Sequence, residues 1–226
     1  MDGVRKLPTS QLNQLPQIIE LILFTNPEKM LDVGVGFGKY GFLSREYLEL
    51  WDDKRRYSNW TNRSNWTKRI DGIEVFKEYL TPVHNFVYDN VYIGNALDIL
   101  PTIGIVYDLI LLIDVLEHFN YGEGLNLLEI CKENARNILI STPKDIGSQE
   151  VIVGNPYETH KFQWKKEHFY IFKGQCFFSD QYSLICYAGE NARRLKKARI
   201  NRHIGKYLPL LIPIAKRMKS RKLSLI

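Results

Sequence analysis

The sequence lacks several features that mark other protein classes. Its 226 residues include three cysteines, Cys131, Cys176 and Cys186, which show no metal-type spacing and cannot all pair within one chain. This excludes a disulfide scaffold and favours a reducing compartment. No apolar stretch approaches the roughly 18 residues that span a bilayer, and the first fourteen residues hold no continuous apolar segment, so neither a membrane span nor a signal peptide is expected. We therefore expect a cytoplasmic globular protein without internal repeats.

Acidic residues are absent after Glu190, whereas Arg193 to Lys222 holds twelve Lys and Arg. The first 192 residues carry 19 basic and 25 acidic side chains, so a mildly acidic body of net charge −6 precedes a basic tail. We expect one domain over 1–190 and a tail over 191–226. The tail favours contact with an anionic membrane, such as the inner membrane surface, or with nucleic acid, or it is a solvated extension.

Apolar segments of strand type alternate with segments of helical spacing. This alternation predicts a parallel, doubly wound α/β sheet. The expected strands are 29–33, 70–75, 91–93, 107–114 and 137–141, and the expected helices are 11–24, 39–50, 77–88 (interrupted near Pro82) and 122–134. The aromatic segments 169–172 and 182–187 are expected to form a closing antiparallel pair.

The most informative motif is Asp32-x-Gly34-x-Gly36-x-Gly38, which follows the first strand and precedes a helix. Glycines let the backbone approach a ligand closely, and such a corner binds nucleotide-like cofactors in open α/β sheets. The spacing differs from the dinucleotide fingerprint Gly-x-Gly-x-x-Gly. A carboxylate at Asp32 would repel a pyrophosphate, but it suits an amino or sulfonium group.

Further residues follow the later strands in order. Glu74 ends the second strand, Gly94-Asn95-Ala96 follows the third, and Asp114 ends the fourth. With the glycine motif, these positions over roughly Pro27 to Phe169 resemble the class I S-adenosylmethionine-dependent methyltransferases.

The resemblance implies a Rossmann-like, seven-stranded, mostly parallel sheet with an antiparallel closing strand, and S-adenosyl-L-methionine as cofactor. It places the Gly34–Gly38 loop and Asp32 at the methionine part and Glu74 at the ribose hydroxyls. Asn95 and Ala96 lie near the adenine, where Asn95 replaces the usual aspartate and Asp98 is an alternative. Asp114 lies where the cofactor and acceptor pockets meet.

One spacing departs from the usual pattern. Asp32 and Glu74 are 42 positions apart, about twice the roughly 20 residues of a first βαβ unit. A polar segment at 51–69 accounts for most of the excess. It is interpreted as an inserted loop that forms either part of a substrate lid or a surface segment.

Catalytic candidates must lie near Asp114, at the carboxyl ends of the strands. His118 and His160 are the best placed histidines, and each could accept a proton from a hydroxyl or amine acceptor. His118 could equally cap the adjacent turn. The aromatic run 157–187 is expected to be mostly core, with Tyr157, His160 and Trp164 as candidate pocket lining.

A second resemblance concerns Asp114-x-x-Glu117-His118 together with His160 before Phe162-Gln163-Trp164. It is similar to the metal-binding pattern of small-RNA 3′-terminal 2′-O-methyltransferases, which implies Asp114, Glu117, His118 and His160 as ligands of Mg²⁺ or Mn²⁺. Asp114 is one methylene shorter than the glutamate of that pattern.

The segments 71–80, 88–100 and 155–169 resemble bacterial methyltransferase domains of unassigned substrate. The expected function is methyl transfer to an O or N atom of a small-molecule, glycan or lipid-linked acceptor. The alternatives are the metal-dependent RNA 2′-O-methyltransferase, a cofactor-binding module without turnover, and a different nucleotide fold such as a dehydrogenase.

Overall fold

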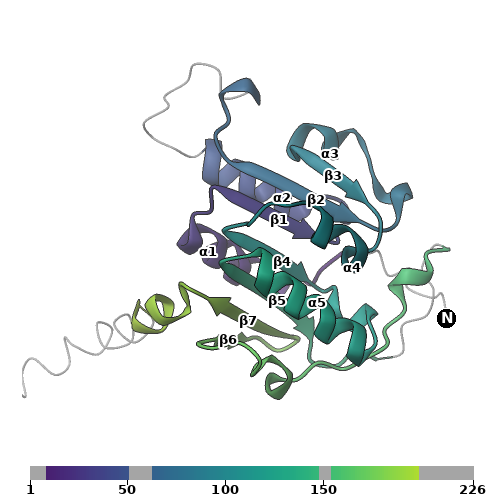
Figure 1. Cartoon of the computed structure of the whole chain (residues 1–226), viewed down its shortest axis with the longest axis vertical. Helices are drawn as coiled ribbons and strands as arrows, with labels where there is room; N and C mark the ends of the chain where they lie inside the picture. Colours follow the sequence, from purple (N-terminus) through teal and green to yellow (C-terminus); the bar gives the residue numbers. More distant parts are fainter. Residues whose placement is uncertain (1–8, 51–62, 148–153, 199–226) are drawn as a thin grey trace, which may run out of the picture.

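The computed structural model describes residues 9–50, 63–147 and 154–198. Seven strands form one sheet in the order β3-β2-β1-β4-β5-β7-β6 (Figure 1). The strands are β1 (Lys29–Val33), β2 (Arg69–Glu74), β3 (Asn90–Ile93), β4 (Leu109–Ile113), β5 (Asn137–Pro143), β6 (Cys176–Ser179) and β7 (Ser183–Gly189). Strands β1 to β5 are parallel, and β7 runs antiparallel to both β5 and β6. The predicted fold class is confirmed.

Helices cover both faces of the sheet. On one face, α1 (Leu15–Thr25), α2 (Lys39–Arg45) and α3 (Pro82–Val87) pack over a core that includes Ile18, Ile70 and Leu111. On the other face, in front in Figure 1, α4 (Ala96–Ile99) and α5 (Tyr121–Asn134) cover Leu31, Leu112 and Ile140. Alternate residues of β1 and β4 therefore enter different cores, as the two-residue repeat of a strand requires. A π-helical turn, Glu46–Leu50, extends α2.

Short 3-10 turns connect many of these elements. They are Leu12–Gln14, Arg63–Asn65, Lys77–Tyr79, Leu100–Thr102, Leu116–His118, Pro156–Glu158 and Lys166–Phe169. The helix expected over 77–88 is divided into the turn Lys77–Tyr79 and α3, because Pro82 cannot donate a backbone hydrogen bond within a continuous helix.

The closing antiparallel pair exists, but its first strand was predicted in the wrong place. Residues 176–179 form β6, whereas Phe169 ends a 3-10 turn and is fully buried beside Trp164. Aromatic density at 169–172 therefore reflects core packing. Large aromatic side chains bury much area in either kind of element, so their density does not identify a strand.

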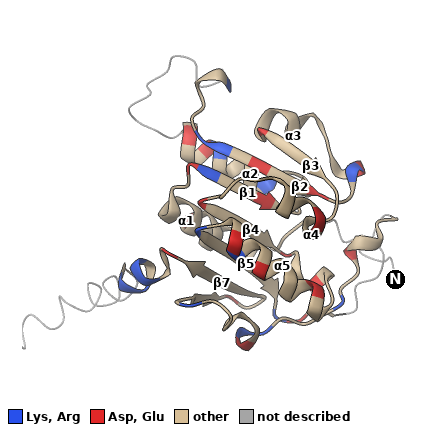
Figure 2. Cartoon of the chain, in the orientation of Figure 1, with Lys and Arg blue, Asp and Glu red and all other residues tan. Residues whose placement is uncertain are grey.

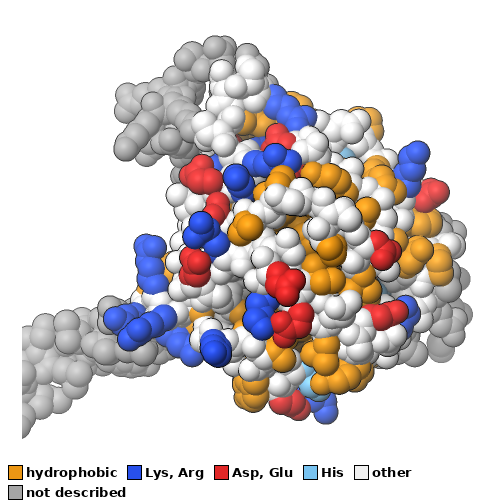
Figure 3. Space-filling model, viewed as in Figure 1, with side chains coloured by type: hydrophobic (Ala, Val, Ile, Leu, Met, Phe, Trp, Pro, Cys, Tyr) orange, Lys and Arg blue, Asp and Glu red, His pale blue; other side chains and the backbone are white. Residues whose placement is uncertain are grey.

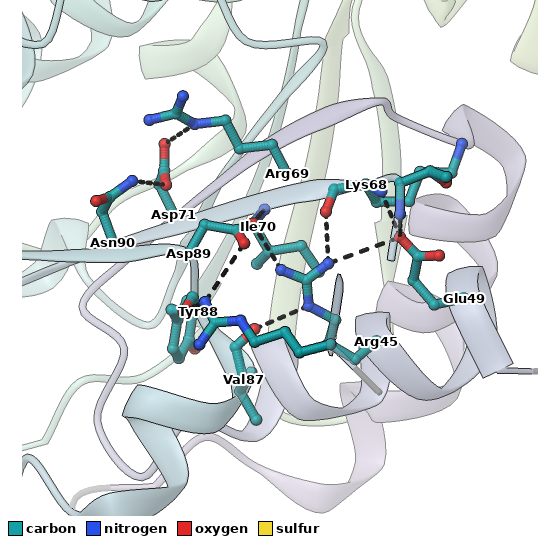
Figure 4. A network of polar contacts seen from close by, with 12 residues as sticks. Arg45, Glu49, Lys68, Arg69, Ile70, Asp71, Val87, Tyr88, Asp89 and Asn90 are labelled. Carbon is teal, nitrogen blue, oxygen red and sulfur yellow. Dashed lines mark hydrogen bonds and ion pairs between the residues drawn. The ribbon is translucent and has the colours of Figure 1, made fainter. Parts of the chain in front are cut away.

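Polar contacts anchor the described end of the inserted segment to α2 (Figure 4). The buried carboxylate of Glu49 accepts hydrogen bonds from the backbone N–H groups of Thr67 (2.7 Å) and Lys68. Arg45 donates to the carbonyl oxygens of Lys68, at 2.5 Å, and Val87, at 2.8 Å. It also pairs with the carboxylate of Asp89 at 2.6 Å.

These contacts lie where the chain enters the amino end of β2. The glycine loop and Glu74 lie at the carboxyl ends of β1 and β2, at the other edge of the sheet. Residues 63–68 therefore give no support to the expectation of a substrate lid. Residues 51–62 lie outside the described residues.

The start of the basic tail packs on the domain. Residues 192–198 are helical, with Ala192 and Leu195 buried, and the guanidinium of Arg194 lies over the Phe24 ring at 5.2 Å. Lys and Arg residues gather on this helix (Figure 2), and their side chains lie at the surface there (Figure 3). The remainder of the basic tail, from residue 199 on, lies outside the described residues. The expected contact of this tail with a membrane or nucleic acid therefore falls mostly on residues that the structure does not describe. Within the part of the chain that the structure describes, no helix has the length and apolarity to cross a membrane.

Candidate active site

A cavity of about 280 Å³ opens at the carboxyl ends of the strands. It lies where the strand order reverses between β1 and β4, the position at which open α/β sheets bind ligands. Its wall comes from five segments: 9–11 at the amino-terminal side, 33–40 after β1, 73–79 after β2, 94–96 after β3 and 113–123 after β4. Pro143 and residues 155–161 complete it.

The glycine loop forms the floor between β1 and α2. Gly34 has φ 74°, and a Cβ built there would lie 2.8 Å from Cγ2 of Val115, so a larger side chain would be both strained and crowded. The backbone N–H of Gly36 donates to Oε2 of Glu74 at 3.0 Å. The first loop is thus tied to the end of β2.

Glu74 has the geometry expected of a ligand carboxylate. It is 4% exposed and lines the cavity, and its Oε1 accepts a second hydrogen bond, from the N–H of Phe76 at 3.0 Å. Burial raises the pKa of Glu74 above its ordinary value, while the amide donors act in the opposite direction. Two amides therefore fix the orientation of a carboxylate at the cavity wall.

Asp32, expected at the methionine part of the cofactor, is not among the residues that line the cavity. Its neighbours Leu31 and Val33 face the core under α5, so Asp32 points to the α2 and α3 side. There its Oδ2 accepts a hydrogen bond of 2.6 Å from the Tyr88 hydroxyl. Burial raises the pKa of Asp32 to about 7. In this geometry Asp32 supports the loop from beneath.

Asn95 and Ala96 line the cavity at the start of α4, as expected. Oδ1 of Asn95 accepts a hydrogen bond from the N–H of Leu97 at 3.0 Å and so caps this helix. Asp98, the alternative to Asn95, is exposed and is not part of the cavity wall.

Asp114 takes a left-handed backbone conformation, φ 55°, which is uncommon for a residue other than glycine and is concentrated at functional sites. Its Oδ2 accepts a 2.6 Å hydrogen bond from Nε2 of Gln14, whose Oε1 accepts from the Ser141 hydroxyl. Oδ1 of Asp114 is buried without a hydrogen-bond partner among the described residues. Burial raises the pKa of Asp114 to about 6.

The structure brings His118, His160 and Glu117 together beside Asp114. One ligand atom from each of the three lies within 4.8 Å of the others, and the two imidazole centroids are 5.1 Å apart. Nδ1 of His160 donates to the carbonyl oxygen of Ile146 at 2.6 Å, which leaves Nε2 as the unprotonated nitrogen of a neutral ring. Burial and the neighbouring His160 lower the pKa of His118 to about 4.

Glu117 is 1% exposed, and its Oε2 has no hydrogen-bond partner within the described segments. Burial, followed by the nearby Asp114 carboxyl group, raises the pKa of Glu117 well above its ordinary value. Asp114, the fourth metal candidate, is engaged with Gln14 and is not part of the three-residue cluster.

Trp164 was expected in the pocket lining, but it is 1% exposed and belongs to the core. Its Nε1 donates to the carbonyl oxygen of Leu116 at 2.9 Å, and the N–H of Lys161 donates to that of Glu117 at 2.7 Å. The indole therefore holds the turn that carries His118. Tyr157 and His160 do line the cavity.

No protein-family model and no curated protein matches the sequence. Solved structures do match. The methyltransferase domain of bacterial CtHen1-CN aligns with a TM-score of 0.53 and 18% identity over 80% of this chain and 100% of that chain. A proposed O-methyltransferase from Nostoc punctiforme PCC 73102 aligns with a TM-score of 0.52 and 16% identity over 77% of this chain and 56% of that chain. Magnesium protoporphyrin IX methyltransferase from Synechocystis PCC 6803, with bound S-adenosylmethionine, aligns with a TM-score of 0.50 and 13% identity over 78% of this chain and 77% of that chain.

The chain has the class I methyltransferase fold. It spans little more than half of the Nostoc protein, and at these identities the likeness concerns the fold alone.

Sequence reasoning missed three residues of this cavity wall, Lys39, Tyr79 and Asn155, and one residue behind it, Gln14, which contacts Asp114. Nζ of Lys39 donates to the carbonyl oxygen of Ser10 at 2.9 Å. This contact holds the amino-terminal segment at the cavity wall. Gln14 carried no detectable signal, because its burial and its contact with Asp114, 100 positions away, depend on the folded structure. Tyr79 and Asn155 carried none, since their contact joins segments 76 positions apart.

Proposed function

We propose that this protein is an S-adenosylmethionine-dependent methyltransferase that acts on an O or N atom of a small-molecule, glycan or lipid-linked acceptor. The observation that carries the proposal is Glu74: an oriented carboxylate at the end of β2, tied to the glycine loop and facing the cavity at the switch point. A carboxylate there can accept hydrogen bonds from two vicinal ribose hydroxyls.

The residues present fit this cofactor. The cavity wall includes the carboxyl groups of Glu74 and Asp114, which suit a ligand that carries a sulfonium cation. The backbone of Gly34 and Gly36 lines the cavity and can approach the methionine part, whereas Gly38 does not line it; Asn95 and Ala96 follow β3, on the side that suits the adenine. Asp114 lines the same cavity as the two histidines.

When bound, the cofactor supplies an electrophilic methyl group. The protein's part is to align the acceptor and to accept its proton. Nε2 of His160 is suited to take that proton, because Nδ1 is committed to the Ile146 carbonyl. His118 is neutral near pH 7, since its pKa is low, and it can accept a hydrogen bond from the acceptor.

The test is label transfer from methyl-tritiated S-adenosylmethionine to fractionated cell extract, with and without a chelator. The proposal predicts enzyme-dependent labelling that is unchanged by chelator. Binding of S-adenosylhomocysteine without labelling of any fraction would instead indicate a binding module without turnover.

A second function is favoured by one specific observation, the cluster of Glu117, His118 and His160. Two imidazoles and a carboxylate suit Mn²⁺ better than the harder Mg²⁺, and Oε2 of Glu117, which has no hydrogen-bond partner within the described residues, fits a cation ligand. The metal would polarise the 2′-hydroxyl of an RNA terminus. Labelling of RNA that disappears with chelator and returns with Mn²⁺ would establish this function in place of the first.

A further inference from the structure

The charges on the cavity wall restrict the acceptor. Five carboxyl groups and two ammonium groups line it, and no arginine occurs among the described lining residues. The carboxyl groups outnumber the ammonium groups of Lys39 and Lys161, and Lys39 is already bonded to Ser10. Phosphate groups are usually bound by arginine forks or by free lysines. The described wall therefore lacks the usual groups for binding a phosphate, and its excess of carboxyl groups favours an uncharged acceptor over a phosphorylated one.

Aromatic rings at the mouth supply an apolar surface. Phe37 is 54% exposed and Tyr157 is 48% exposed, and both line the cavity. The Phe37 ring lies nearly parallel to that of Tyr79, with an interplanar angle of 19° and centroids 6.5 Å apart. Exposed aromatic faces next to a cavity mark contact surfaces for ligands, and they pack well against the C–H face of a sugar ring.

Polar groups beside these rings are held in fixed positions. The Tyr79 hydroxyl donates to Oε1 of Glu158 at 3.0 Å and accepts from Nδ2 of Asn155 at 3.0 Å. Asn155 is 1% exposed, and its Oδ1 accepts from the N–H of Tyr157 at 2.9 Å. This network presents Glu158 at the cavity wall, two residues before His160. A carboxylate is a common partner for sugar hydroxyls, because each of its oxygens can accept more than one hydrogen bond.

We propose that the methyl acceptor is an uncharged carbohydrate, which packs a ring face on Phe37 and Tyr157 and donates its hydroxyls to Glu158. This inference rests on the proposed methyltransferase function and names its substrate class. One sugar hydroxyl gives its proton to His160 and its oxygen gains the methyl group, while the cofactor leaves as neutral S-adenosylhomocysteine.

Other acceptor classes fit the wall less well. A nucleic acid also stacks on aromatic rings, but single strands are bound along grooves rich in Lys and Arg. A flat apolar acceptor matches the rings but leaves Glu158 and Lys161 without use, and a pocket for such a ligand has few polar groups.

The test measures methyl transfer by the full-length protein to three matched sets: neutral methyl glycosides and oligosaccharides, their 6-phosphates, and a short RNA. We expect kcat/KM for the best neutral sugar to exceed that for its 6-phosphate at least tenfold. Transfer only to phosphorylated sugars or RNA, or to no carbohydrate while another extract fraction is labelled, overturns the inference and leaves the methyltransferase proposal standing. No binding of S-adenosylhomocysteine overturns both.

A pair of variants tests the aromatic surface. Tyr157→Ala should raise the KM for the neutral sugar about tenfold, with kcat and the affinity for S-adenosylhomocysteine unchanged. Tyr170→Ala removes a similarly exposed ring, 63% exposed, that does not line the cavity and should change none of these. Equal KM values for the two variants would contradict the assigned surface.

Discussion

Three carboxyl groups surround the glycine loop, and each has a different partner. Glu74 accepts from amide N–H groups, Asp114 accepts from Gln14, and Asp32 accepts from the Tyr88 hydroxyl under the loop. All three are buried in a medium that disfavours charge, so the pKa of each is raised. The folded protein therefore retains protons that the unfolded chain has lost.

Asp32→Asn tests this effect on stability. Because the pKa of Asp32 rises from 3.8 to about 7 on folding, the native state binds more protons between these values, and stability falls as the pH rises through this window. Above about pH 7 the effect is constant. The asparagine keeps the acceptor for Tyr88 but cannot titrate. We expect the free energy of unfolding of the variant to fall less steeply from pH 5 to 7, by up to about 1.4 kcal/mol per pH unit.

The measurement is urea unfolding at several pH values, with Asp98→Asn, an exposed aspartate, as control. Identical slopes for the wild type and Asp32→Asn would show that Asp32 is ionised in the native state.

Single residues also show the limit of sequence reasoning. The motifs predicted that Asp32, Glu74 and Asp114 lie at or near the carboxyl ends of the strands, because each follows or ends a predicted strand. It did not predict which side of β1 Asp32 faces, since that depends on the register of Leu31 and Val33 in the core. Contacts between distant segments, such as Gln14 with Asp114, leave no local pattern to read.

At the scale of elements, packing of α5 against Trp164 holds the turn that carries His118. Gly124 of α5 allows this, since a Cβ there would lie 2.3 Å from Cζ2 of Trp164. Apolar periodicity predicted β1, β4 and α5 well, because each has a regular buried face. It failed for β6, whose position depends on pairing with β7.

Gly124→Ala should therefore destabilise the protein by roughly 1–3 kcal/mol, because the buried indole has no room to move. The displaced turn should also lower the rate of methyl transfer. Thermal unfolding provides the measurement. Gly122→Ala in the same helix is the matched control: its Cβ would come no closer than 3.6 Å to Asn120, so it should be neutral or stabilising by up to about 1 kcal/mol. Equal unfolding temperatures for the two variants would contradict this account.

At the scale of the whole molecule, the sheet separates two kinds of polar site. The carboxyl ends of the strands carry the cavity. At the amino end of β2, Arg45 and Glu49 bind the backbone of residues 67–68 and so anchor the end of the insertion (Figure 4). The location of the cavity was predictable, because the carboxyl ends of parallel strands meet at one edge of the sheet and the motifs there follow the strands in chain order. The anchoring of the insertion was not predictable, since the sequence places the insertion between β1 and β2 without showing which residues bind its ends.

The central claim is that Glu74 holds the cofactor at this switch point. Calorimetric titration with S-adenosylhomocysteine tests it most directly, in the wild type, Glu74→Gln and the control Asp98→Asn. We expect micromolar-range binding to the wild type and the control, no detectable NAD binding, and a loss of about tenfold in affinity for Glu74→Gln, about 1.4 kcal/mol. Equal affinity of Glu74→Gln and the wild type, or a preference of the wild type for NAD, would contradict the account.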